Sequence, residues 1–207
     1  MKPTSFVPTV AAISPEDAAE IPGLEAAISH WTGGACPAEK WFREVNAGWG
    51  TAGFVSRRGG DALGFVVYAP AEHLPHAGAY PLGPLDGSGV LLACVTGDGR
   101  TRRRLLVRTL RDLKHRGVVR VEAIASDRGA PHHAPTPFLL ESGWKPVRRG
   151  WHRGGPYTLA RTDLGSAVEV GELARGLVGR VKLPHLKAPK PAPGALAHAA
   201  KPQDSHT

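Results

Sequence analysis

The chain has 207 residues, of which 42% are hydrophobic, and its formal net charge is +8 at pH 7. This length and apolar content exclude a disordered or collagen-like chain and fit one domain with a core. The two cysteines, Cys36 and Cys94, are too few for a disulfide framework and indicate a reducing compartment. No apolar stretch has the length of a membrane span, and the N-terminus lacks the apolar run of a signal peptide. We therefore expect a cytoplasmic protein with no membrane partner.

The first third of the chain predicts an edge strand, two helices and a hairpin. Ser14 is a favourable N-cap and Pro15 suits the first helical turn, so a helix should begin there. Two β-rich runs joined by a glycine-containing turn are typical of a hairpin. The predicted elements are an edge strand over 5–10, a helix from 14 to about 30 that restarts near 22, a helix over 37–49, and hairpin strands over 53–57 and 63–68.

The middle of the chain predicts a strand–helix–strand unit. Residues 90–95 form an apolar run bounded by glycine, which is typical of a buried central strand. Residues 103–115 place leucines on one helical stripe and arginines on another, and Gly117 should end this helix. Residues 118–124 form the next strand, so the two strands should pair in parallel.

The last third predicts smaller elements and a tail. A loop over 126–136 contains His132 and His133, and a short helix over 137–142 follows. Two more strands are expected over 144–148 and 157–161. The chain then divides into a folded domain over 1–165, a C-terminal helix over 166–182 and a disordered tail rich in Pro, Ala and Lys over 183–207.

Three stretches within this order of elements carry a family resemblance. They are LGFVVYAP at 63–70, the helix and turn over 105–118, and FLLESGW at 138–144. Together they resemble the GNAT superfamily of N-acetyltransferases, which implies an α/β fold with a mixed sheet between helices. The resemblance further implies an enzyme that moves an acetyl group from acetyl-CoA to an amine without a metal. Dimers are common in that family, so a homodimer is one expectation.

The resemblance also places the coenzyme. In the family the central strand offers backbone groups to the pantetheine arm, and amides at the next helix start bind the pyrophosphate. The two glycine positions of the family's loop fall here on Arg100 and Arg102, and the loop is several residues short. The arginines could bind phosphate through their side chains, or form a solvated loop that has lost its ligand. The implied coenzyme-binding residues are Leu92, Cys94, Val95, Gly97, Gly99, Arg100, Arg102, Arg103 and Arg104.

Two carboxylates are candidates for the base that an N-acyltransferase needs. The family's usual tyrosine acid falls on Leu139, which cannot serve. Glu122 could act through water, or could be a strand carboxylate paired with Arg120 or a helix arginine. Asp127 follows the same strand and could face a cleft or simply be a turn residue.

The acceptor side is expected in the loop after residue 69. Tyr68, Glu72 and His73 are the candidates for substrate binding, with His76 nearby in the sequence. The side chains of Tyr68 and Cys94 are otherwise expected in the core. Adjacent side chains point apart, so we expect His132 and His133 to be solvated rather than metal ligands.

A second reading is a GNAT-fold protein without catalysis, acting as an acyl-CoA sensor or as an interaction module. Arg104, Arg108 and Arg111 form a basic stripe that could dock on nucleic acid or remain a solvated face. The missing glycines and the missing tyrosine favour this second reading, whereas the family resemblance favours the enzyme.

Overall fold

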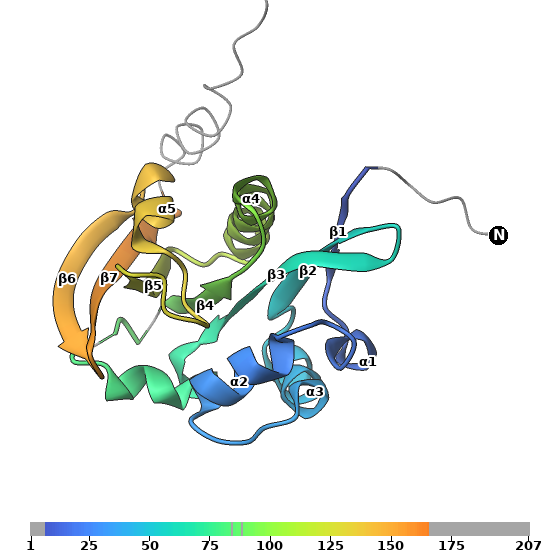
Figure 1. The fold of residues 1–207 in the computed structure, drawn as a ribbon, viewed down its shortest axis with the longest axis horizontal. Coiled ribbons are helices and arrows are strands. Elements are labelled where there is room, and N and C mark those ends of the chain that lie inside the picture. The colour runs from blue at the N-terminus through green and yellow to red at the C-terminus, as the bar shows by residue number, and fades with distance from the viewer. Residues whose placement is uncertain (1–6, 84, 88, 166–207) are drawn as a thin grey trace, which may run out of the picture.

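A seven-stranded sheet forms the centre of the computed structural model, which describes residues 7–83, 85–87 and 89–165 (Figure 1). Its strand order is β1-β2-β3-β4-β5-β7-β6. Strands β4 and β5 pair in parallel, and the other neighbours pair antiparallel. The strands are β1 (Thr9–Ala12), β2 (Gly53–Arg58), β3 (Asp61–Pro70), β4 (Val90–Val95), β5 (Arg120–Ser126), β6 (Lys145–His152) and β7 (Gly155–Asp163).

Helices cover both faces of the sheet. Figure 1 shows α4 and α5 on one face and α1, α2 and α3 on the other. Two short 3-10 helices, η1 and η2, follow β3. The predicted mixed α/β architecture is therefore confirmed. The helices are α1 (Pro15–Ala18), α2 (Leu24–Thr32), α3 (Ala38–Gly48), η1 (Ala71–His73), η2 (Pro75–Ala79), α4 (Gly99–His115) and α5 (Thr136–Glu141).

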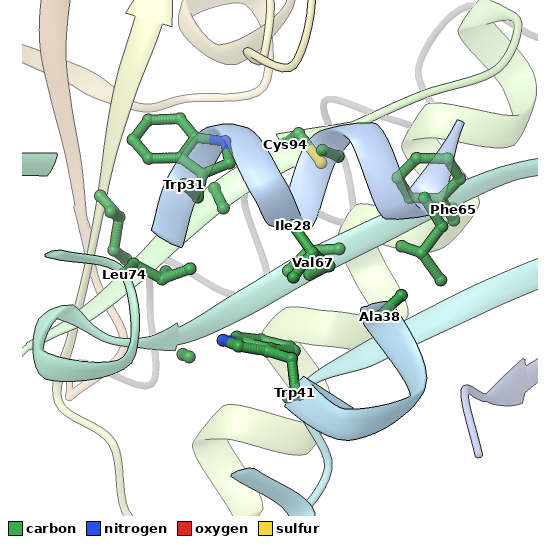
Figure 2. Packing of buried hydrophobic residues seen from close by; sticks show 14 of the residues in the cluster. Ile28, Trp31, Ala38, Trp41, Phe65, Val67, Leu74 and Cys94 are labelled. Atoms are coloured by element: carbon green, nitrogen blue, oxygen red, sulfur yellow. The ribbon is translucent and has the colours of Figure 1, made fainter. Parts of the chain in front are cut away.

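Each face of the sheet has its own hydrophobic core, because strand side chains alternate between the two faces. On the α2 face, Ile28 and Trp31 of α2 and Trp41 of α3 pack against β3 and β4, where Val67 and Cys94 lie (Figure 2). On the opposite face, leucines of α4 pack against the other side of the same strands. Burying a large side chain such as Trp31 contributes roughly 2–3 kcal/mol, so these two cores fix the helices on the sheet.

The helix boundaries follow capping groups that the sequence only partly reveals. The Asp17 N–H donates to Ser14 Oγ at 3.2 Å, which confirms the predicted cap of α1. That helix ends after one turn, and α2 starts again at Leu24. Helix α4 begins at Gly99, four residues before the predicted start, because the Asp98 carboxylate accepts the Thr101 N–H and caps an earlier turn.

Several strands differ from their predicted bounds. The first strand is Thr9–Ala12 instead of 5–10, and residues 1–6 lie outside the described part. Strand β5 is Arg120–Ser126, two residues later than predicted, because the Val118 N–H donates back to the Leu113 carbonyl of α4 at 3.0 Å instead of to a neighbouring strand. Strands β6 and β7 are longer than predicted and form a hairpin. The helix predicted over 166–182 and the tail over 183–207 also lie outside the described residues.

Candidate functional site

The sheet opens between its two parallel strands. Strands β4 and β5 pair only at Val90 with Val121 and at Leu91 with Glu122. Beyond these pairs, β4 continues against β3 and β5 continues against β7. The β3–β4 register also shifts, so that Ala93 is an extra residue on β4. Bulges of this kind are over-represented beside active sites. We call residues 92–95 of β4 and 123–126 of β5 the β4–β5 fork.

At its C-terminal end, the β5 arm of the fork pairs with a later segment of the chain. The Ser126 N–H donates to the Ala134 carbonyl at 2.9 Å, and Ser126 forms an isolated parallel bridge with Pro135. The segment after β5 therefore folds back along this strand. Asp127 anchors that segment, since its Oδ1 accepts the hydroxyls of Thr136 at 2.6 Å and Thr158 at 2.8 Å.

The fork leads directly to the start of α4. Only three residues separate β4 from α4, and Gly97 among them has φ +99°. A Cβ at Gly97 would lie 2.8 Å from the Leu63 carbonyl oxygen, so the turn requires glycine. The backbone hydrogen bond from Thr101 to the Asp98 carboxylate lowers the pKa of Asp98. The positive end of the helix thus already holds one carboxylate of the chain.

A cavity of about 220 Å³ lies beside this helix start. Arg100 and Arg104 of α4 and Arg58 of β2 line it, together with Asp98 and Thr101. Guanidinium groups bind phosphate through two parallel hydrogen bonds, so this cavity can hold an anion despite the one carboxylate in its wall.

Glu122 has a different partner from the one expected. Its Oε1 accepts Arg161 Nη2 at 2.7 Å and Nε at 3.0 Å, and its Oε2 accepts the Asp86 N–H at 2.8 Å. The expectation of Arg120 or a helix arginine is wrong, because Arg161 lies directly opposite Glu122 in the β5–β7 register. Arg120 instead binds Asp163 and Asp86. Glu122 is buried, with only 2% of its surface exposed.

A hydrogen-bonded chain of histidine and tyrosine lies between α2 and the segment after β5. The Tyr80 hydroxyl is 3.1 Å from His30 Nε2 and 2.8 Å from His133 Nε2. His133 Nδ1 is 2.7 Å from the Pro131 carbonyl oxygen and must donate to it, so the Nε2 of the neutral ring accepts. Tyr80 therefore donates to His133, and the N–H of His30 donates to Tyr80. The chain of hydrogen bonds runs in one direction.

These histidines are neutral at physiological pH. Burial, with the nearby histidines adding to it, lowers the pKa of His30 to about 4. Burial likewise lowers the pKa of His133 to about 4 and raises the pKa of Tyr80 above its usual value. The expectation that His133 is solvated is wrong, because Trp31, Tyr80 and Tyr157 pack around its ring. No sequence spacing links these residues, which come from separate segments.

Comparison with known proteins gives a match of fold. No family model and no curated protein matches the chain. A candidate acetyltransferase from Salmonella typhimurium, solved with its cofactor acetyl-CoA, superposes with a TM-score of 0.55 at 18% identity, covering 77% of this chain and 96% of that chain. An N-acetyltransferase from Staphylococcus aureus superposes with a TM-score of 0.55 at 16% identity, covering 76% of this chain and 99% of that chain. A GNAT-family acetyltransferase from Streptococcus pneumoniae superposes with a TM-score of 0.52 at 11% identity, with the same coverage of the two chains, 76% and 99%. The chain has the GNAT fold.

The residues predicted to bind coenzyme occupy three different places in the fold: the buried strand β4, the start of α4, and the side of α4 that faces α5. The side chains of Leu92, Cys94 and Val95 are buried, so contact with a ligand would use their backbone. Burial raises the pKa of Cys94 to about 12, which keeps its thiol protonated. Gly97 and Gly99 lie at the helix start, with Arg100 and Arg104 in the cavity wall. Arg102 lies over the Phe138 ring at 5.3 Å and Arg103 is 4.0 Å from Glu141, so both turn toward α5.

The three predicted substrate residues do not lie together. The Tyr68 hydroxyl donates to Asp112 Oδ2 at 3.1 Å on the α4 face, and burial raises its pKa. Glu72 and His73 belong to η1 on the other side, where Trp41 Nε1 donates to the His73 carbonyl at 3.0 Å. Tyr68 therefore has the surroundings of a core residue, whereas Glu72 is exposed.

Two further features bear on the class of site. Within the described residues, no group of three or more His, Cys, Asp or Glu side chains is arranged to hold a metal ion. In that same part of the chain, no helix is both long and apolar enough to cross a membrane.

Proposed function

We propose that this chain is an acyl-CoA-dependent N-acyltransferase that moves an acetyl group from acetyl-CoA to an amine. The observation that carries the proposal is the β4–β5 fork, which leads within three residues to a helix start flanked by arginines, all on a GNAT fold. The fork offers backbone groups to an extended ligand, and the first turn of α4, where Arg100 and Arg102 lie, offers N–H and guanidinium groups to its phosphates. The Salmonella structure of the same fold was solved with acetyl-CoA, which supports this donor.

In the proposed reaction, the amine nitrogen attacks the thioester carbonyl carbon. A C–N bond forms, the C–S bond breaks, and the thiolate of CoA leaves. The ammonium proton passes to a base. Asp127 is the better placed of the two predicted bases, because both of its hydrogen bonds end on Oδ1, and Oδ2 has no partner within the described residues. Glu122 accepts bonds on both oxygens and is buried. The acceptor side, for which Glu72 and His73 were predicted, stays a prediction.

A second candidate is a GNAT-fold protein that has lost catalysis. The specific observation behind it is the Asp98 carboxylate, which occupies the end of α4 where a pyrophosphate would bind. A bound pyrophosphate would be repelled by this charge. The two candidates therefore differ in whether acetyl-CoA binds.

Calorimetric titration with acetyl-CoA separates the two candidates. We expect saturable binding, weakened about tenfold in Arg100→Gln, which loses a charge-assisted phosphate contact. Asp98→Asn keeps an N-cap side chain and removes its charge, so affinity should rise about twofold to fivefold without loss of stability. Arg149→Gln, an exposed change on β6, is the matched control. No binding to the folded wild type or to Asp98→Asn would favour the inactive protein, and thiol release with a panel of amines tests the transfer itself.

A further inference from the structure

Helix α4 carries more arginine than the proposed coenzyme site uses, because Arg108 and Arg111 lie beyond that site. Arg100, Arg104, Arg108 and Arg111 follow one another at intervals of three or four residues, so they share one face of the helix. At about 1.5 Å of rise per residue, they extend along about 16 Å of the helix axis. Asp112 is the one acidic residue in the seventeen residues of α4.

This face lines two adjoining cavities. The first, of about 220 Å³, contains Arg100 and Arg104, and the second, of about 400 Å³, contains Arg103, Arg104, Arg108 and Arg111. Arg104 belongs to both. The edge strand β1 and the residue before it supply part of the opposite side, with Pro8 in the first cavity and Val10 in the second. We call Arg58 and these five α4 arginines, with the two cavities they line, the arginine track.

Most of the positive charge along the track is not neutralised by the described residues of the chain. In the described part of the chain, no carboxylate lies within 4.0 Å of Arg104, Arg108 or Arg111, and Arg103 reaches Glu141 only at 4.0 Å. Among the described residues, Asp98 is the one carboxylate that lines either cavity. Uncompensated charge of one sign in a groove attracts a counter-ion of opposite charge.

Two of the arginines are held in position by their neighbours. Arg104 Nη1 donates to the Pro8 carbonyl at 3.4 Å, and the guanidinium of Arg108 lies 5.0 Å from the centre of the Phe54 ring. Held side chains lose less entropy when they bind a ligand. Arg111 remains exposed at the end of the row.

We propose that the arginine track binds the phosphate backbone of a nucleic acid. Arginine matches the geometry of phosphate, and a row of four such groups over about 16 Å fits successive phosphates of one strand better than a single pyrophosphate. Among the described residues, no aromatic side chain lines either cavity, so this part of the chain offers bases no surface on which to stack, and we expect binding to be independent of sequence. This function goes beyond acyl transfer and does not depend on it.

The test is fluorescence anisotropy with a labelled oligothymidylate of about 20 nucleotides, titrated between about 50 and about 200 mM salt. The wild type should bind with an affinity that falls steeply with salt. The variant Arg104→Gln/Arg108→Gln/Arg111→Gln should lose about tenfold in affinity at low salt, and its log–log salt slope should be smaller by about 2, since each phosphate contact on a single strand contributes about 0.7.

The matched control removes three positive charges elsewhere. Lys40→Gln/Arg43→Gln/Arg149→Gln, on α3 and β6, should keep the wild-type salt slope. Arg111→Glu alone, at an exposed side chain, guards against a folding defect in the triple variant and should also weaken binding. The proposal is overturned if the wild type does not bind the oligonucleotide, if the control loses as much affinity as the track variant, or if polyglutamate of similar length binds equally well, which would indicate an acidic protein partner.

Discussion

Glu122 and two histidines of this protein are paired with other groups of the chain, whereas most of the arginines along α4 have no acidic partner among the described residues. Glu122 and His133 are buried and His30 is half-buried, and their hydrogen bonds are made within the chain. The arginine track lies at the surface, with three of its guanidinium groups lacking an acidic partner among the described residues. Internal pairs stabilise the fold, whereas uncompensated surface charge is available to a ligand. This difference separates the residues that stabilise the fold around the proposed site from the arginines that are available to bind a ligand.

The largest effect is expected from a substitution that breaks the ion pair between Glu122 and Arg161. In Arg161→Leu, the buried Glu122 carboxylate loses two hydrogen bonds and its countercharge, so the free energy of unfolding should fall by about 3–5 kcal/mol. Urea denaturation followed by circular dichroism measures it. The double variant Glu122→Leu/Arg161→Leu should recover most of the loss, because no unpaired charge remains. A single variant as stable as the wild type would show that this pair does not support the fold.

A second, pH-dependent effect belongs to His133. Its pKa is about 4 in the folded protein and about 6.5 when unfolded, so the unfolded state binds the proton first as pH falls. The stability from the neutral ring is complete above about pH 6.5 and is lost as the pH falls toward 4, by on the order of 3 kcal/mol. His133→Gln, which can still accept from Tyr80 but does not titrate, should show a flatter acid limb in the same measurement. An unchanged limb would mean that other groups cause the loss.

The smallest expected effect belongs to the arginine track. Arg111→Gln should change the free energy of unfolding by less than about 0.5 kcal/mol, since the side chain is exposed and has no acidic partner among the described residues. The same variant should weaken oligonucleotide binding. If the free energy of unfolding fell by more than about 1 kcal/mol, Arg111 would be a residue that stabilises the fold. The contrast between the internal pairs and the arginine track would then not hold.

The sequence predicts the elements better than the site, for identifiable reasons. Local signals fix local features: Ser14 with Pro15 marks a helix start, and the apolar run over 90–95 marks the central strand. The start of α4 was missed because the Asp98 cap lies seven residues before Leu105, the first leucine of the apolar stripe. Contacts across the sheet need the strand register, which no local pattern contains. Glu122 therefore meets Arg161, and Tyr80 meets His30 and His133, without any spacing that could have indicated it.

The proposed placement of acetyl-CoA can be tested directly by nuclear magnetic resonance. Backbone amide shifts of the isotope-labelled protein would be followed as acetyl-CoA is added. We predict that the largest shift changes fall on residues 92–95 of the β4–β5 fork and on 99–101 at the start of α4, with little change at Arg111. No shift changes at a large excess of acetyl-CoA, or changes confined to the stretch from Arg104 to Arg111, would contradict an acyl-CoA site in the fork.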